Sequence, residues 1–225
     1  MATDLYTGIH KAIRFALTSF LVEVGASDPG DANRAAALVE RFDDLVELLE
    51  GHAHHEEAHV HPLIARVAPD VLAKLEKAHG GQEAELQLLR AHFVEATTCV
   101  PEARGHHLAL AYRGLASFVA TYLGHMEDEE VLANPALFRG ISEDELMATH
   151  MALVGSIEPP EMARYIRIFM PALHVEERVG MLSGMMAAPA PIAELFLGAA
   201  KAALAPAQWS EVAERLGLAG RQAAA

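Results

Sequence analysis

HAHHEEAHVHP at residues 52–62 and HMEDEEVLANP at residues 125–135 are the two stretches that predict the fold of this chain. Both read histidine, three residues, two glutamates, four residues and proline. On an α-helix each residue advances about 100°, so a histidine and a glutamate four residues later lie about 40° apart on one face. His52 with Glu56, and His125 with Glu129, are therefore each placed to bind one metal ion together.

Two further histidines share a helical face with apolar residues at steps of three and four. These residues are Tyr6, Ile13, Leu17 and Val24 around His10, and Leu72, Leu75, Leu86, Leu89 and Phe93 around His79. The same spacing aligns His125 with Leu115, Phe118, Tyr122 and Leu132. Such stripes face the core of a helical protein, so these histidines are expected to point inward.

Inward glutamates need compensation, because removing a carboxylate from water without a partner costs many kcal/mol. A metal ion supplies that compensation best. The predicted ligands are His10, His52, Glu56, His79, His125 and Glu129. Four imidazoles and two carboxylates suit iron, and carboxylates from two helices can bridge two ions. A centre of two iron ions fits best, although zinc and manganese accept the same donors.

The secondary-structure pattern predicts an all-α protein. The first helix is expected over 4–26. The second begins at the cap Asp31 and reaches about His61, where Pro62 ends or kinks it. The third and fourth are expected over 69–98 and 103–133, and Asn134-Pro135 ends the fourth helix. Four long helices with short links indicate an up-down-up-down antiparallel bundle over residues 1–138. A helical extension over 139–225 is expected to pack on the bundle, beginning at a capping box of Ser142 and Glu145.

The composition restricts the classes of partner. The formal charge of −14 provides no basic field for nucleic acid or an anionic membrane surface. Cys99 is the only cysteine, which excludes an internal disulfide and a self-contained iron–sulfur cluster. The chain shows neither a signal-peptide pattern nor a run of about 18 uncharged apolar residues, so a soluble, cytoplasmic protein is expected.

These motifs resemble the hemerythrin HHE cation-binding family over residues 1 to about 138. The resemblance is carried by the histidine in IHKAIR, by His52-x-x-x-Glu56-Glu57, by the histidine in LEKAHGGQ, and by His125-x-x-x-Glu129-Glu130 before Pro135. It implies an antiparallel four-helix bundle with a non-haem diiron centre, bridged by the two glutamates and open to oxygen, nitric oxide or peroxide.

The chain departs from the oxygen-carrying hemerythrins at two positions. Those proteins have a second histidine on the third helix, where residue 83 is a glutamate here, and an aspartate five residues after the last histidine, where this chain uses Glu129. The resemblance therefore does not carry over reversible oxygen carriage.

Three functions are compatible with these features. The first is a diiron protein that binds or senses a small oxidant or gas, in stress response or iron and redox homeostasis. The second is a diiron oxidase or peroxidase in which Tyr122 or His59 helps to move protons. The third is a metal-stabilised interaction module, whose methionine-rich extension recruits a partner protein. A homodimer through the extension is compatible with each.

Several other residues near the motifs have two interpretations. His59 lies about 20° from His52 on the helix, so it is either an accessory ligand or hydrogen-bond partner, or a core histidine satisfied by backbone. His54 and His61 project away from the ligand face and are expected to be solvated, and Glu57 is expected to make an outward salt bridge. Gly80 and Gly81 either leave room for an exogenous ligand or allow close helix packing.

Overall fold

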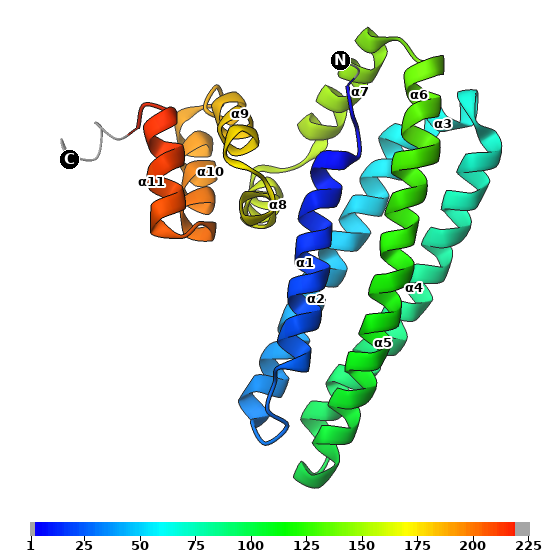
Figure 1. Ribbon diagram of the computed structural model, residues 1–225, viewed down its shortest axis with the longest axis vertical. Helices are drawn as coiled ribbons and strands as arrows, with labels where there is room; N and C mark the ends of the chain where they lie inside the picture. Colours follow the sequence, from blue (N-terminus) through cyan, green and yellow to red (C-terminus); the bar gives the residue numbers. More distant parts are fainter. Residues whose placement is uncertain (1–2, 219–225) are drawn as a thin grey trace. The chain divides into compact units, whose positions relative to one another are not determined.

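The computed structural model describes residues 3–218, and within that range the secondary structure is helical, as predicted (Figure 1). The elements in chain order are α1 Thr7–Gly25, α2 Ala32–His55, the π-helix η1 Glu56–Val60, α3 His61–Val67, α4 Pro69–Thr98, α5 Pro101–Asp128, the π-helix η2 Glu129–Ala133, α6 Asn134–Gly140, α7 Glu143–Ser156, α8 Pro159–Ala172, α9 Val175–Met185, α10 Ala190–Ala203 and α11 Pro206–Arg215. No described helix is long and apolar enough to cross a membrane.

Helix boundaries follow the predicted capping residues. The Asp31 carboxylate accepts a hydrogen bond of 3.0 Å from the backbone N–H of Arg34 and so begins α2. Pro69 begins α4, where its missing N–H costs nothing. Before α7, the Ser142 hydroxyl accepts from the backbone N–H of Glu145 at 3.3 Å. The extension also contains α9, which the sequence pattern did not separate from its neighbours.

The helices do not stop at Pro62 or at Asn134-Pro135, and the predicted end at residue 133 is wrong. Instead each passes through a π-helical turn, in which the N–H of His61 bonds the carbonyl of Glu56 and the N–H of Asn134 bonds that of Glu129. A proline lacks the N–H of an α-helical bond, and its ring clashes with the carbonyl four residues earlier. Widening the turn by one residue removes the clash and lets the helix continue as α3 or α6.

The extra residue in each π turn changes which side chains face inward afterwards. His61, expected to be solvated, is only 5% exposed. In η2 the inward position falls on Ala133, which is fully buried, and Leu132, expected in the core, is 37% exposed. After each π turn, the buried face of the helix therefore moves to the next residue in the sequence, which corresponds to a rotation of about 100° about the helix axis.

Among the described residues the contacts divide the chain into two units, one containing 3–7 together with Ala16–Ala152, the other Gly8–Phe15 together with 153–218. In the first unit, α4 packs against α5 after the short link of Cys99 and Val100, so the two helices are antiparallel, and α2 packs against α4 (Figure 1). Phe20, Phe42 and Phe93 join α1, α2 and α4, with ring centroids 4.9–6.2 Å apart.

In the second unit, α8 packs against α10 and α9 against α11. Its core is apolar: Met162, Ile166, Met170, Leu182, Phe196 and Val212 are buried. The buried Arg178 donates from Nε to the backbone carbonyl of Met170 at 2.6 Å, which satisfies a carbonyl near the end of α8.

Candidate metal centre

The two motif glutamates stand at the first position of each π turn and are buried together with their histidines. Glu56 is 3% and Glu129 is 0% exposed. His52 Nε2 lies 3.1 Å from Glu56 Oε1, and His125 Nε2 lies 3.3 Å from Glu129 Oε1. In each motif the histidine lies in the last turn of the α-helix and the glutamate follows as the first residue of the π-helix. The two side chains therefore lie on one face, as predicted.

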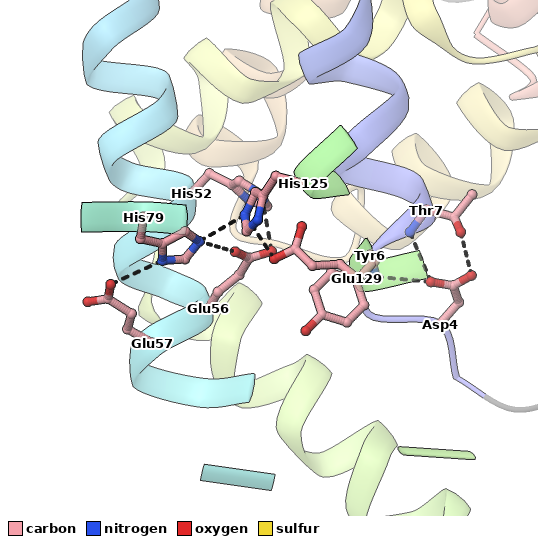
Figure 2. Close-up of polar contacts among 9 residues, drawn as sticks. All are labelled: Asp4, Tyr6, Thr7, His52, Glu56, Glu57, His79, His125 and Glu129. Carbon is pink, nitrogen blue, oxygen red and sulfur yellow. Dashed lines mark hydrogen bonds and ion pairs between the residues drawn. The ribbon is translucent and has the colours of Figure 1, made fainter. Parts of the chain in front are cut away.

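His79, on α4, brings the two motifs together (Figure 2). Its Nε2 lies 3.0 Å from Nε2 of His125 and 3.6 Å from Oε2 of Glu56. Its Nδ1 lies 3.2 Å from Oε1 of Glu57, so that carboxylate fixes the plane of the imidazole. His79 thus contacts a ligand residue of each motif.

The predicted ligands fall into two groups that can each hold a metal ion. One group contains His10, His52, Glu56 and Glu129, and the other contains Glu56, His79, His125 and Glu129. Within each group the ligand atoms lie within 4.8 Å of one another. His10, on α1, is fully buried. Glu56 and Glu129 belong to both groups.

The donor spacing fits a transition-metal ion. Ligand bonds of about 2.1 Å place neighbouring ligand atoms about 3.0 Å apart in an octahedron and about 3.4 Å apart in a tetrahedron. The measured separations among the histidines and glutamates run from 3.0 to 3.6 Å. Imidazole nitrogens and carboxylate oxygens are also the donors that iron, zinc and manganese accept. The residues present therefore fit a metal ion.

Two residues near the centre differ from their sequence interpretation because of the first π turn. His61 stacks on His79, with ring centroids 5.5 Å apart and planes 21° from parallel. Burial and the neighbouring His79 lower the pKa of His61, which favours the neutral ring. Glu57 is exposed, as expected, but its partner is His79 rather than a surface lysine or arginine. Both residues support the imidazole on α4.

Tyr6 is a functional candidate that the sequence pattern placed only as a core residue. Its side chain is fully buried beside Glu129 (Figure 2). Burial and the charges of Glu56 and Glu129 raise the pKa of its phenol well above 10.0, so it keeps its proton. Asp4 holds this end of the chain by accepting hydrogen bonds of 2.9 Å from the backbone N–H groups of Tyr6 and Thr7.

An open pocket of about 340 Å³ lies next to His79, and its lining includes His54, Gly80, Gln82, Glu83 and Tyr122. A Cβ added at Gly80 or Gly81 meets nothing within 4 Å, so the glycines do not serve close helix packing. Tyr122 is 2% exposed, with its ring 5.8 Å from that of His125.

His59 is half-buried and belongs to neither buried ligand group among the described residues. Its role as an accessory ligand or hydrogen-bond partner therefore stays a prediction. His54 is exposed, as expected for a solvated histidine.

Comparison with known proteins yields one family. The sequence model described as "Hemerythrin HHE cation binding domain" matches residues 1–137, more than half of the chain. No curated protein and no solved structure matches. The matched range contains both motif stretches and all six predicted ligands.

Proposed function

This chain belongs to the hemerythrin HHE cation-binding family, and from that premise we propose that it is a non-haem diiron protein that binds or senses a small oxidant or gas. The candidate ligands are oxygen, nitric oxide and peroxide. The proposal includes the fold that the family implies, an antiparallel bundle of α1, α2, α4 and α5 within residues 1–138, followed by a helical extension over 139–225.

The overlap of the two ligand groups is the observation that carries the proposal. Because Glu56 and Glu129 belong to both, two ions can be held close together and share these carboxylates. His10 and His52 then serve one ion, and His79 and His125 serve the other. When bound, iron supplies one-electron redox chemistry and an open coordination position for a small molecule.

The remaining side chains of the centre have distinct roles. Glu57 accepts from Nδ1 of His79, which leaves Nε2 of that ring as the ligand atom. Tyr6 brings a buried phenol hydroxyl close to the two glutamates. The pocket at Gly80 provides the approach for a small molecule from the side of His79.

A diiron oxidase or peroxidase is the second candidate, and the two tyrosines buried near the centre, Tyr6 and Tyr122, favour it. Tyr6 lies beside Glu129 (Figure 2). Tyr122 lines the pocket, and its ring lies 5.8 Å from that of His125, so each tyrosine is placed to hold a proton near the centre. Turnover of hydrogen peroxide distinguishes this candidate from a binding protein. Loss of turnover in Tyr6→Phe or Tyr122→Phe, with metal content unchanged, would identify the proton-bearing residue.

The first experiment is metal analysis of the purified full chain together with its visible absorption spectrum. The reduced protein is exposed separately to air, hydrogen peroxide and nitric oxide. We expect two iron ions per chain and an absorption band that responds to at least one of the three. His106→Ala, altered at an exposed histidine that belongs neither to the centre nor to the pocket, should behave like the wild type. An iron-loaded protein whose spectrum responds to none of them would contradict the proposal.

A further inference from the structure

A second group of metal-binding side chains lies on α4 and α5, away from the buried centre. His92 and Glu95 are on α4 and His107 is on α5, and their ligand atoms lie within 4.8 Å of one another. His92 follows His79 on the same helix by 13 residues, which at 1.5 Å per residue is about 20 Å. The two groups are therefore separate sites.

Both histidines present the same atom to one carboxylate oxygen. Nδ1 of His107 lies 3.0 Å from Oε2 of Glu95, and Nδ1 of His92 lies 3.5 Å from that same oxygen. The two Nδ1 atoms are shielded from solvent, and neither makes a well-aligned hydrogen bond among residues 3–218. Two nitrogen donors and one carboxylate oxygen therefore converge on one point without the alignment of a hydrogen bond.

The spacing matches a tetrahedral ion. With ligand bonds of about 2.0–2.1 Å, neighbouring ligand atoms of tetrahedral zinc lie about 3.3 Å apart, between the two distances measured at Glu95. Two imidazoles and one carboxylate are also a known donor set of zinc sites that keep a fourth position for water. The side chains of His92, Glu95 and His107 are 36%, 52% and 22% exposed, so water can occupy that position.

We propose that His92, Glu95 and His107 form a second, solvent-accessible site for a divalent transition-metal ion, with Zn²⁺ as the best-fitting ion. The site joins α4 to α5 across the short link of Cys99 and Val100. Because the folded hairpin holds the three ligands together, the ion should bind it more tightly than the unfolded chain, and zinc should therefore raise the thermal stability of the protein. The site uses none of the residues of the buried centre.

Zinc uptake by the full chain tests this site. The protein, with the metal content of its buried centre measured beforehand, is dialysed to equilibrium against micromolar Zn²⁺ and analysed for zinc. The wild type should gain one zinc ion that His107→Ala and the isosteric Glu95→Gln do not gain at the same concentration. Their affinity should fall at least about tenfold, because even outer partners of metal ligands contribute about 10–100-fold. His106→Ala, an exposed neighbour, is the matched control and should gain zinc normally.

The comparison is repeated in a His52→Ala background, where the buried centre lacks a ligand. The difference in zinc between the parent and its His107→Ala derivative should persist there, which makes this test independent of the proposed diiron centre. Equal zinc uptake by wild type, His107→Ala and Glu95→Gln, all with the same circular dichroism spectrum, would overturn the proposal. Equal loss of zinc in His106→Ala would overturn it as well.

Discussion

The two motif stretches share one backbone design but support different parts of the molecule. Each places a histidine before a π turn, a glutamate at the first position of that turn and a proline after it, and each buries the residue that precedes the proline. In the first stretch that residue is His61, which stacks on His79 of α4. In the second it is Asn134, whose side chain bonds Asp4 before α1. The repeat therefore duplicates the ligand geometry, while each copy orders a different neighbouring helix.

The largest expected effect tests the part that the two stretches have in common. Glu56→Gln and Glu129→Gln should each lose both metal ions, because each glutamate belongs to both ligand groups. His79→Ala, which removes a member of one group only, should retain one ion. Elemental analysis of the purified chains measures the number of ions. Retention of one ion by either glutamine variant would show that the two carboxylates are not equivalent, and so break the comparison.

The next effect concerns the residues that differ between the two stretches. His61→Ala should lower the free energy of unfolding by about 1–3 kcal/mol and also weaken metal binding, because the buried ring supports His79. Asn134→Ala should lower it by about 1 kcal/mol through the lost bond to Asp4, with a smaller change in metal affinity. Urea unfolding of the metal-free protein measures the stability.

Leu132→Ala is the control for this pair, because Leu132 lies in the second stretch but is 37% exposed. Its free energy of unfolding should change by no more than about 0.5 kcal/mol. Equal loss of metal affinity in His61→Ala and Asn134→Ala would mean that the two stretches do not divide their supporting roles as the contacts indicate.

The sequence predicts those parts of the site that depend on residues within one helical turn, and it does not predict those that depend on more distant residues. The pairing of His52 with Glu56 follows from helical spacing alone. The π turns do not, because their cause is a proline that comes six residues after the glutamate, and a proline is more often the end of a helix. The matching prolines at 62 and 135 were the available signal, and they account for the rotation that buries His61 and exposes Leu132.

The sequence pattern could not predict contacts between side chains on different helices, for a separate reason. Nothing in the sequence spacing of His92 and His107 shows that both approach Glu95. The register of α4 against α5 decides that contact, and register depends on packing along the whole length of two helices. Tyr6 was likewise recognised as an inward residue, but its position beside Glu129 required the structure.

A smaller effect concerns the carboxylate that follows Glu56. Glu57→Gln should weaken metal binding by about tenfold, because the amide is a poorer acceptor for the N–H of His79 than the carboxylate. Glu50→Gln, another glutamate that lines the pocket, should leave the affinity unchanged. Competition with a chelator measures both. If the two variants bind equally, Glu57 is a surface charge whose contact with His79 contributes nothing to the centre.

The smallest expected effect is the pH dependence that Asp4, the partner of Asn134 in the second stretch, adds to the stability of the fold. Burial opposes ionisation of Asp4, but hydrogen bonds from Thr7, Tyr6 and Asn134 outweigh it and hold the pKa of Asp4 below 3.8. A carboxyl whose pKa is lower in the folded chain stabilises the fold above its unfolded pKa, and this contribution is lost as pH falls through the folded value.

Asp4→Asn should therefore reduce the drop in melting temperature of the metal-free protein between pH 6 and pH 3. Leu132→Ala, which removes no titratable group from the second stretch, should show the same drop as the wild type in this acid range. A full acid-induced drop in Asp4→Asn would mean that Asn134 supports the start of α1 through packing rather than through the charge of Asp4.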